Sequence, residues 1–486
     1  MPIADALVHV QCAYTSLGRM NTVGMLARER PFFARACGAI SKAVVMVGYG
    51  DDADARLAAA ITPEGWAGRF ACVCNDEGRE PGWFQAGVPE RVLAHLRAAG
   101  CASALVVTDQ HYGGEVAVQT AGALRSAGMR VGLVARCGYH WSWTVARDTA
   151  PDDPRATAAA LMEGDLCRSA DAVIATTRRI AADLAWQHRL ASEKVSVVPN
   201  FVLPPGEAPA FADREKGSVL FAGRLEAEKR LDLLVKAMAI VGREVAGARL
   251  TIVGDGSLGE SLRRLAKELG APVEFRARLA HEELLRAMGR CNVYAQVSRF
   301  EGHPKTILEA LAMGAPCVVT RAPGVDEEIV PRQTGMICGE EPWQIAAEIV
   351  ELLRRPEEAA RIGAAAAADV RSRLTIDAVF PAMLGVWRGA MATAGSMAAP
   401  VCLPVRWEQT LLNVGPDAAA AQFASSVGAF AKRLGPARRA QVLEGGAGRR
   451  GASWEGGAGD VSGWAGGAAG VDRGDGAGGG YGVAGC

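Results

Sequence analysis

The sequence predicts an α/β fold built from two doubly wound parallel sheets in series. Short β-rich runs alternate with amphipathic stretches along most of the chain, and this alternation restarts after a proline-rich segment near residues 199–206. Alternation of this kind is typical of parallel sheets with helices on both faces. A chain of 486 residues, half of them apolar, is long enough for two or more separate cores.

The first half of the chain predicts one such domain over residues 1–200. Amphipathic stretches at 89–99 and 116–127 are followed by Gly100 and Gly128, where helix ends prefer glycine. The predicted strands are Ala6–Val10, Ala43–Val47, Phe70–Cys74, Ala104–Val107, Arg130–Ala135, Ala172–Ala175 and Val195–Val198.

The second half predicts another domain over residues 201–394, reached through Pro199-Asn200 and the linker Leu203–Gly206. Its last helix, at about 376–391, is a candidate for packing back on the first domain. Ligands bind beyond the carboxyl ends of the strands in such sheets. The predicted strands are Ser218–Ala222, Arg249–Val253, Val273–Phe275, Val293–Gln296 and Pro316–Thr320.

The remaining residues, 395–486, differ in composition from the two domains. From Glu444 onward Gly, Ala, Ser and Asp dominate, with almost no large aliphatic side chains. A segment of this composition cannot bury enough apolar surface to fold. We therefore predict a disordered, low-complexity C-terminal tail.

Charge, cysteine content and hydropathy restrict the partners and the location. Lys+Arg and Asp+Glu balance at 53 each, so no global basic excess indicates a nucleic-acid partner. The twelve cysteines are scattered, and the lone Cys72 and Cys74 pair lacks the second pair of a zinc site. Neither a signal peptide nor an apolar run of about 18 residues is found. These features predict a cytoplasmic protein whose membrane contact, if any, is peripheral at the inner face.

The densest chemical signal lies in the segment 300–310, which follows a predicted strand. Gly302 frees the backbone for a tight turn, and Pro304 suits the first position of a helix. The backbone amides of Lys305 and Thr306 would then be unpaired at the helix start. Unpaired amides and the helix dipole together favour an anion such as phosphate.

Two glutamates flank this helix start. Glu301 lies in the loop before it and Glu309 lies inside the helix, with His303 between them. A carboxylate can accept hydrogen bonds from two sugar hydroxyls, so a pair beside a phosphate site suits a sugar phosphate. The structural alternative is a solvated Glu301 and a Glu309 paired with a neighbouring cation.

Two further motifs occupy corresponding strand ends in the same domain. Gly223, Arg224 and Lys229 follow one predicted strand, and a planar guanidinium with a mobile ammonium suits a diphosphate. Gly254 and Gly256 follow the next strand and form a G-x-G turn, a weak signal on its own. Together the three motifs predict a nucleotide-binding site at this edge of the sheet.

These motifs resemble the donor-binding domain of family 4 glycosyltransferases, retaining enzymes of the GT-B fold. The family's two glutamates with seven residues between them are matched by Glu301 and Glu309, and its G-R-L…K run by Gly223-Arg224-Leu225 and Lys229. The resemblance is specific over about 218–339. It is weaker over 104–200, where Pro199-Asn200 matches the interdomain P-N.

The resemblance implies roles for individual residues. Arg224 and Lys229 would bind the donor diphosphate, Glu309 the nucleotide ribose, and Glu301 would face the transferred sugar. His111, on a loop of the first domain, matches a histidine that the family often places near that sugar. The predicted catalytic set is Glu301, His111, Arg224 and Lys229, and the predicted donor-binding set is Gly223, Arg224, Lys229, Gly254, Gly256, Gly302, His303, Lys305, Thr306 and Glu309.

The implied reaction is transfer of a sugar from a nucleoside diphosphate to an acceptor hydroxyl, with retention and without a cofactor. The acceptor would be a polysaccharide, a lipid-linked glycan or another glycoconjugate. A metal-dependent transferase would need a D-x-D at a strand end; Asp52-Ala53-Asp54 fits the letters but is interpreted as a solvated turn, so no metal is predicted. The alternatives are an epimerase or hydrolase of the same architecture and a non-catalytic nucleotide-sugar-binding scaffold.

Overall fold

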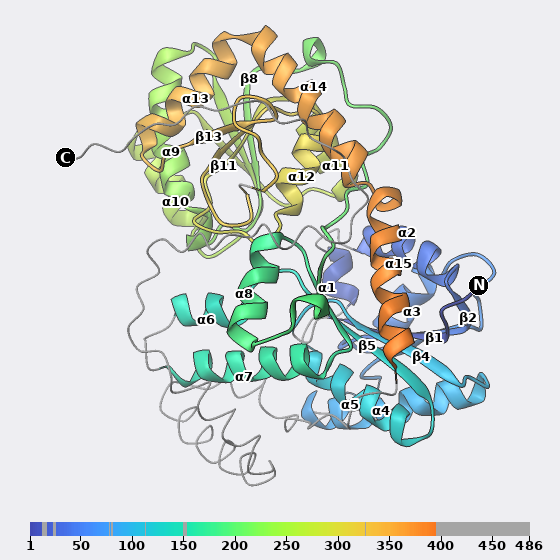
Figure 1. Ribbon diagram of the computed structural model, residues 1–486. Helices are drawn as coiled ribbons and strands as arrows, with labels where there is room; N and C mark the ends of the chain where they lie inside the picture. The colour runs from blue at the N-terminus through green and yellow to red at the C-terminus, as the bar shows by residue number, and fades with distance from the viewer. Residues whose placement is uncertain are drawn as a thin grey trace, which may run out of the picture. The chain divides into compact units, whose positions relative to one another are not determined.

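The computed structural model describes residues 1–11, 17–22, 26–76, 78, 81–111, 113–148, 153–325 and 327–394. The tail predicted over 395–486 lies outside the described residues. Within them the chain forms two parallel sheets, one of seven strands and one of six (Figure 1). The predicted α/β class with two doubly wound sheets is confirmed.

The first sheet has the strand order β3-β2-β1-β4-β5-β6-β7. All neighbouring strands are parallel, and β1 pairs with both β2 and β4 through residues such as Leu7 and Val8. The strands are rich in Val and Ala and largely buried, as expected for a parallel sheet covered on both faces. The strands are β1 (Ala4–Val10), β2 (Ile40–Val47), β3 (Phe70–Val73), β4 (Ser103–Thr108), β5 (Arg130–Cys137), β6 (Ala172–Ala175) and β7 (Val195–Val197).

Helices cover this sheet on both sides. One buried cluster joins its strands to α4, α5, α7 and α8, and another joins them to α1, α2, α3 and α15. The helices of the first half are α1 (Leu17–Thr22), α2 (Leu26–Cys37), α3 (Asp52–Ile61), α4 (Pro81–Ala98), α5 (Gly114–Ser126), α6 (Trp141–Asp148), α7 (Pro154–Ser169) and α8 (Arg178–His188).

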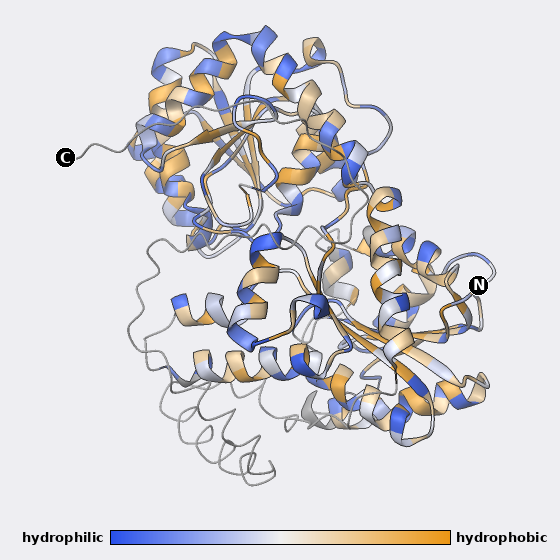
Figure 2. Cartoon of the chain, in the orientation of Figure 1, coloured by the Kyte–Doolittle hydropathy of each residue, from blue (hydrophilic) through white to orange (hydrophobic). Residues whose placement is uncertain are grey.

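The second sheet has the order β10-β9-β8-β11-β12-β13 and is again parallel throughout. Its strands are β8 (Glu215–Ala222), β9 (Arg249–Val253), β10 (Val273–Arg276), β11 (Cys291–Gln296), β12 (Cys317–Thr320) and β13 (Met336–Cys338), and its helices are α9 (Leu231–Glu244), α10 (Gly259–Glu268), α11 (His281–Arg290), α12 (Lys305–Ala312), α13 (Pro342–Arg354) and α14 (Pro356–Arg373). The central strands are largely hydrophobic, whereas β10 and the start of β8 carry charged residues and the helices carry hydrophilic segments as well (Figure 2).

The chain passes between the two domains at two places that are bonded to each other. Residues 198–203 lead into the second domain, and residues 374–376 lead out of it. Val202 pairs with Thr375 in an isolated bridge, and the Val202 amide donates to the Leu374 carbonyl at 2.8 Å. The two crossings therefore form one short connection.

The last described helix, α15 (Ile376–Thr393), packs on the first sheet beside β5 and β6. Trp387 is fully buried and contacts the ring of Phe32 on α2 at a centroid distance of 6.1 Å. The Arg130 guanidinium donates to the Met391 carbonyl at 3.0 Å. No helix among the described residues is both long and apolar enough to cross a membrane.

Candidate functional site

The loops that follow β8 and β9 pack against each other through their backbones. Gly254 has φ +140°, and a Cβ atom there would overlap the Gly223 carbonyl. A Cβ atom at Gly256 would overlap the backbone of Leu225. These contacts require glycine at both predicted positions, whether or not the loops also bind a ligand.

An ion pair joins two of the predicted motifs. The Lys229 ammonium lies 2.6 Å from Glu301 Oε1, although the residues are 72 positions apart in the chain. The two side chains are only 14% and 11% exposed. The predicted diphosphate-binding lysine and the predicted sugar-facing carboxylate thus lie at one place, beyond the carboxyl ends of β8 and β11.

Gln296, the last residue of β11, orients this carboxylate. Its amide nitrogen donates to Glu301 Oε1 at 2.5 Å, and its amide oxygen accepts from the hydroxyls of Thr306 at 3.1 Å and Tyr294 at 3.0 Å. Gln296 was not among the predicted site residues. A polar residue at the end of an otherwise apolar buried strand is the signal that could have indicated it.

The helix after this loop begins directly after Pro304, which the sequence places at the first helical position. Lys305 is the first residue of α12, and Pro304 occupies the N-cap with φ −73° and ψ 100°. The extended ψ places Pro304 outside the helix. Pro304 provides no side-chain cap. The α12 start carries the positive end of the helix dipole, which favours an anion.

The second glutamate, Glu309, is buried inside α12 with 3% exposure. The His281 Nε2 atom, at the start of α11, lies 2.9 Å from Glu309 Oε1. His281 was not predicted as a site residue. The structure thus gives Glu309 an imidazole partner, whereas the structural alternative pairs it with a neighbouring cation.

Arg224 lies on the same loop as Gly223 but closer to solvent. Its side chain is 64% exposed and its guanidinium lies 2.5 Å from Glu228 Oε1. Among the contacts of the described residues, it does not join the pair of Lys229 and Glu301. The two predicted cations therefore have different surroundings in the ligand-free protein.

Gly302 sits where the second domain touches the first. A Cβ atom at Gly302 would overlap the Gly138 carbonyl on the loop after β5 and lie 2.9 Å from the Tyr139 side chain. On the other side, Gly324 has φ +81°, and a Cβ atom there would overlap the Gly302 carbonyl. The loop that carries Glu301 is thus held between two neighbouring loops.

His303 is bonded on both sides of its ring. Its Nδ1 accepts from the Asn200 amide at 2.9 Å, and its Nε2 lies 3.0 Å from Glu328 Oε1. The Asn200 side chain also donates to the His303 carbonyl at 2.9 Å. Because both ring nitrogens have protein partners, His303 can contact a donor through its side chain only by exchanging one of them.

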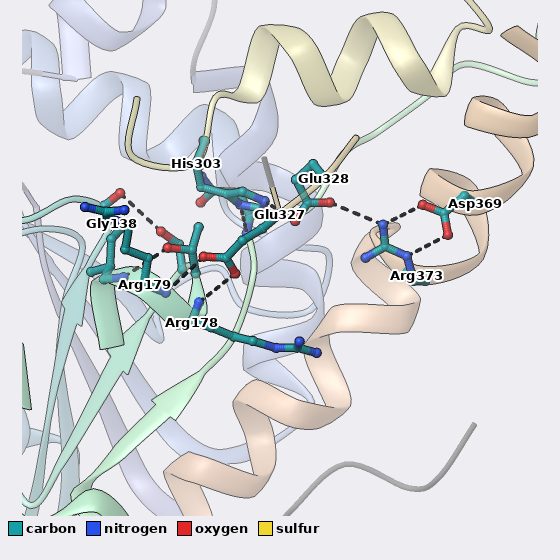
Figure 3. A network of polar contacts seen from close by, with 12 residues as sticks. Gly138, Arg178, Arg179, His303, Glu327, Glu328, Asp369 and Arg373 are labelled. Carbon is teal, nitrogen blue, oxygen red and sulfur yellow. Dashed lines mark hydrogen bonds and ion pairs between the residues drawn. The ribbon is translucent and has the colours of Figure 1, made fainter. Parts of the chain in front are cut away.

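Figure 3 shows the polar network around His303. Burial would raise the pKa of Glu328, but the hydrogen bond from His303 and the nearby Arg373 guanidinium hold it below its usual range. The adjacent Glu327 carboxylate accepts from the backbone amides of Arg178 at 2.8 Å and Arg179 at 2.9 Å. These two bonds place a carboxylate of the second domain at the N-terminus of α8.

His111 lies in the interior of the first domain, where its side chain is fully buried. Its Nε2 donates to the Tyr139 carbonyl, and its Nδ1 lies 3.3 Å from Glu163 Oε1. Burial lowers the pKa of His111. The described contacts connect it to Glu301 only indirectly, through the loop 138–139 against which Gly302 packs.

A small cavity of about 50 Å³ lies between the strand ends of the first sheet and the start of α12. Lys305 lines it from the second domain, and His9, Asp109, Arg136 and Asn200 line it from the other side. Arg136 donates to Asn200 Oδ1 at 2.6 Å. Lys305 and Asn200 bring the predicted donor helix next to polar groups of the first domain.

The D-x-D of the first domain differs from its predicted role as a solvated turn. Asp52 begins α3, but Asp54 is 1% exposed. Its carboxylate accepts from the amides of Gly50 at 2.8 Å and Gly18 at 3.2 Å. The solvated interpretation is wrong for Asp54, because a short acidic side chain near a helix start can satisfy loop amides instead.

The sequence of the second domain matches the model of a known protein family. Residues 208–369 match the family model described as "Glycosyl transferases group 1". Over this range the second domain is similar to glycosyl transferases group 1. The matched range includes the predicted donor residues from Gly223 to Glu309 and leaves the first domain outside.

Curated relatives resemble part of the chain. A GDP-mannose-dependent monoacylated alpha-(1-6)-phosphatidylinositol monomannoside mannosyltransferase of Corynebacterium glutamicum is 31% identical over 156 residues, covering 31% of this chain and 41% of the relative. A D-inositol 3-phosphate glycosyltransferase of Streptomyces scabiei is 30% identical over 243 residues, covering 46% and 54%. The chain therefore matches about half of these relatives' length.

Solved structures match both domains. Anabaena HepE in complex with UDP and glucose aligns with a TM-score of 0.58 at 17% identity, covering 78% of this chain and 98% of that one. A sucrose-phosphate synthase from Thermosynechococcus elongatus aligns with a TM-score of 0.60 at 17% identity, covering 80% and 100%. At this identity the likeness shows the fold, and the fold is GT-B.

Proposed function

We propose that the protein is a glycosyltransferase that moves a sugar from a nucleoside diphosphate to an acceptor hydroxyl, with retention of anomeric configuration. One observation carries the proposal. The contact between Lys229 and Glu301 joins a cation suited to a diphosphate and a carboxylate suited to a sugar, at the carboxyl edge of a parallel sheet. The family match of the surrounding domain supports it.

In this proposal the leaving diphosphate is stabilised by positive groups of the second domain. Lys229 and Arg224 supply charge from the loop after β8, and the first amides of α12 supply a helix dipole. Charge on the diphosphate grows as the bond to the sugar breaks. Positive groups that contact the diphosphate therefore stabilise the transition state more than the ground state.

The ion pair of the ligand-free protein has a role in the same step. Binding of the diphosphate would draw the Lys229 ammonium from Glu301 toward phosphate. Glu301 would keep its bond from Gln296, which holds the carboxylate in place. A fixed carboxylate beside the ring would then stabilise the oxocarbenium-like sugar.

Glu309 is proposed to hold the nucleotide ribose, with His281 as its partner in the absence of nucleotide. The proposed acceptor enters from the first domain and is a glycan, a lipid-linked glycan or another glycoconjugate. GDP-mannose and UDP-sugars are the first donors to test and inositol phosphates the first acceptors, because the relatives and structural neighbours carry these names.

The experiment begins with thermal unfolding in the presence of UDP, GDP and ADP, since only ligands of the folded state raise the melting temperature. The stabilising nucleotide selects the sugar donors for assays with and without acceptor. Transfer product with the donor's anomeric configuration, assigned by NMR, is the expected result. Donor turnover without dependence on acceptor would favour an epimerase or hydrolase, and binding without turnover would favour a scaffold.

The proposed transfer uses side-chain cations and needs neither a metal ion nor a cofactor beyond the donor. Turnover is expected to be the same with and without added Mg²⁺ or Mn²⁺. An absolute requirement for either ion would contradict this part of the proposal.

A further inference from the structure

The first domain contains a second buried polar cluster, formed by three of the chain's seven histidines around one carboxylate. His188 Nε2 lies 3.0 Å and His140 Nε2 3.5 Å from Glu163 Oε2. His111 Nδ1 lies 3.3 Å from Glu163 Oε1. The Glu163 side chain is fully buried, and no imidazole in the cluster is more than 6% exposed.

The cluster is assembled from separate elements of the fold. Glu163 projects from α7, His188 is the last residue of α8, and His140 directly precedes α6. The Trp141 amide donates to Glu163 Oε1 at 2.8 Å, and the Ser142 hydroxyl donates to Oε2 at 2.5 Å. The carboxylate is therefore fixed by the first turn of α6.

Hydrogen bonding within the cluster is incomplete. His111 donates from Nε2 to the Tyr139 carbonyl, and its Nδ1 atom faces Glu163 Oε1 at 3.3 Å. Neither this Nδ1 nor His140 Nε2 forms a hydrogen bond among the described residues. Buried polar atoms without partners are costly, and a bound ion is one way to satisfy them.

The ionic partners of Glu163 are imidazoles alone among the described salt bridges. A buried carboxylate needs a compensating charge. The ligand atoms of His140, Glu163 and His188 all lie within 4.8 Å of one another, close enough to bind one ion. Two imidazole nitrogens and a carboxylate oxygen are a set that Zn²⁺ accepts in proteins, with water or another ligand in the fourth position.

We propose that His140, Glu163 and His188 bind a divalent transition-metal ion, with Zn²⁺ as the first candidate and a water molecule as the fourth ligand. The bonds from Trp141 and Ser142 to the carboxylate orient it, as outer partners do in metal sites. Room for the His188 ring comes from Gly164, where a Cβ atom would lie 2.8 Å from His188 Nδ1.

The ion would tie α6, α7 and α8 together and hold the loop 138–140 in place. This loop contacts Gly302, beside the predicted sugar-facing Glu301. The metal site is thus a structural support behind the candidate donor site and takes no part in the transfer step. Its existence does not depend on the proposed glycosyltransferase activity.

The test uses the full chain, loaded with Zn²⁺ and dialysed, with bound metal measured by plasma mass spectrometry. About one zinc per chain is expected. His188→Gln and Glu163→Gln should each weaken Zn²⁺ affinity at least about 100-fold, measured by competition with a chromogenic chelator. His95→Gln, which alters an exposed histidine on α4, is the matched control and should keep the affinity of the unaltered chain.

Thermal unfolding provides a second measurement, which does not require His188→Gln or Glu163→Gln to fold. Because the ion binds the folded chain, Zn²⁺ should raise the melting temperature of the unaltered chain and of His95→Gln, and chelation should reverse the shift. Co²⁺ in the same site should give the visible absorption of a tetrahedral ion. A dialysed chain without bound zinc that melts at the same temperature with and without Zn²⁺ would overturn the proposal, as would undiminished affinity in a folded His188→Gln.

Discussion

Lys229→Ala and Arg224→Ala should have different effects on the stability of the ligand-free protein. Lys229→Ala leaves the Glu301 carboxylate, only 11% exposed, without its cation. Breaking a fully buried pair costs about 3–5 kcal/mol, so this partly exposed pair should cost about 2 kcal/mol of unfolding free energy. Arg224 is 64% exposed, and a surface pair of this kind contributes at most about 1 kcal/mol.

Lys229→Ala and Arg224→Ala should both weaken binding of the nucleoside diphosphate. A charge-assisted hydrogen bond to the diphosphate contributes about 1.5–3 kcal/mol, or roughly 10- to 100-fold in affinity. The loss of affinity in Lys229→Ala should lie at the lower end of this range, about 10-fold, because Lys229 must break its ion pair with Glu301 before it can bind phosphate. Turnover should fall further than affinity. Arg224→Lys should restore binding only in part, since an ammonium cannot form the planar fork of a guanidinium.

Calorimetry with a nucleoside diphosphate and with the matching nucleoside tests the binding, and urea unfolding tests the stability. The nucleoside should bind both variants almost as it binds the unaltered chain, because it offers no charge to either cation. Equal loss for nucleoside and diphosphate would mean that the site is misplaced or the fold damaged. Unchanged diphosphate affinity in both variants would refute the assignment of the two cations.

Three further predictions concern other residues. Glu309→Ala should weaken nucleoside and nucleoside diphosphate alike, by roughly 10-fold, whereas Glu301→Gln should mainly lower kcat; equal losses of nucleotide affinity in calorimetry would contradict these separate roles. Burial lowers the pKa of His9 to about 4, so as pH falls below about 6.5 the unfolded chain binds a proton that the folded chain does not. Acidification from pH 7 to 5 should therefore lower the free energy of unfolding by about 2 kcal/mol at this residue. In urea titrations, His9→Gln should lose correspondingly less of its unfolding free energy over the same pH range. Glu327→Ala removes the carboxylate that caps α8 and should lower the unfolding free energy by about 1 kcal/mol in the same assay, while an unchanged value would show that water replaces the cap.

The strands were predictable because their signal is local. Apolar runs such as Arg249–Val253 and Ala172–Ala175 coincide with β9 and β6 as the structure has them. β13 was missed, since a strand of three residues is too short to show a pattern. Pro304 lies at the N-cap of α12 instead of the first helical position, because proline suits both places.

The candidate site was predictable only where its residues fall in recognisable motifs. The meeting of Lys229 and Glu301 follows from two motifs at neighbouring strand ends. The contact of Gln296 with Glu301 spans only five residues, and its polar side chain at the end of an apolar strand is a local signal. The bonds of His281 to Glu309 and of Asn200 to His303 join residues 28 and 103 positions apart, and such partners cannot be read from the local sequence.

The position of α15 has a consequence for synthesis of the chain. The bond from Arg130 to Met391 spans 261 residues, and Trp387 on the same helix fills the core beside Phe32. During synthesis, α1, α2 and α3 can cover their part of this apolar face of the first sheet early, but the part beside β5 and β6 stays uncovered until the whole second domain and α15 have been made. Until then that part is open to aggregation, as in other proteins whose contacts close late. A fragment that ends near residue 200 would keep this exposed surface permanently and should depend on chaperones to stay in solution.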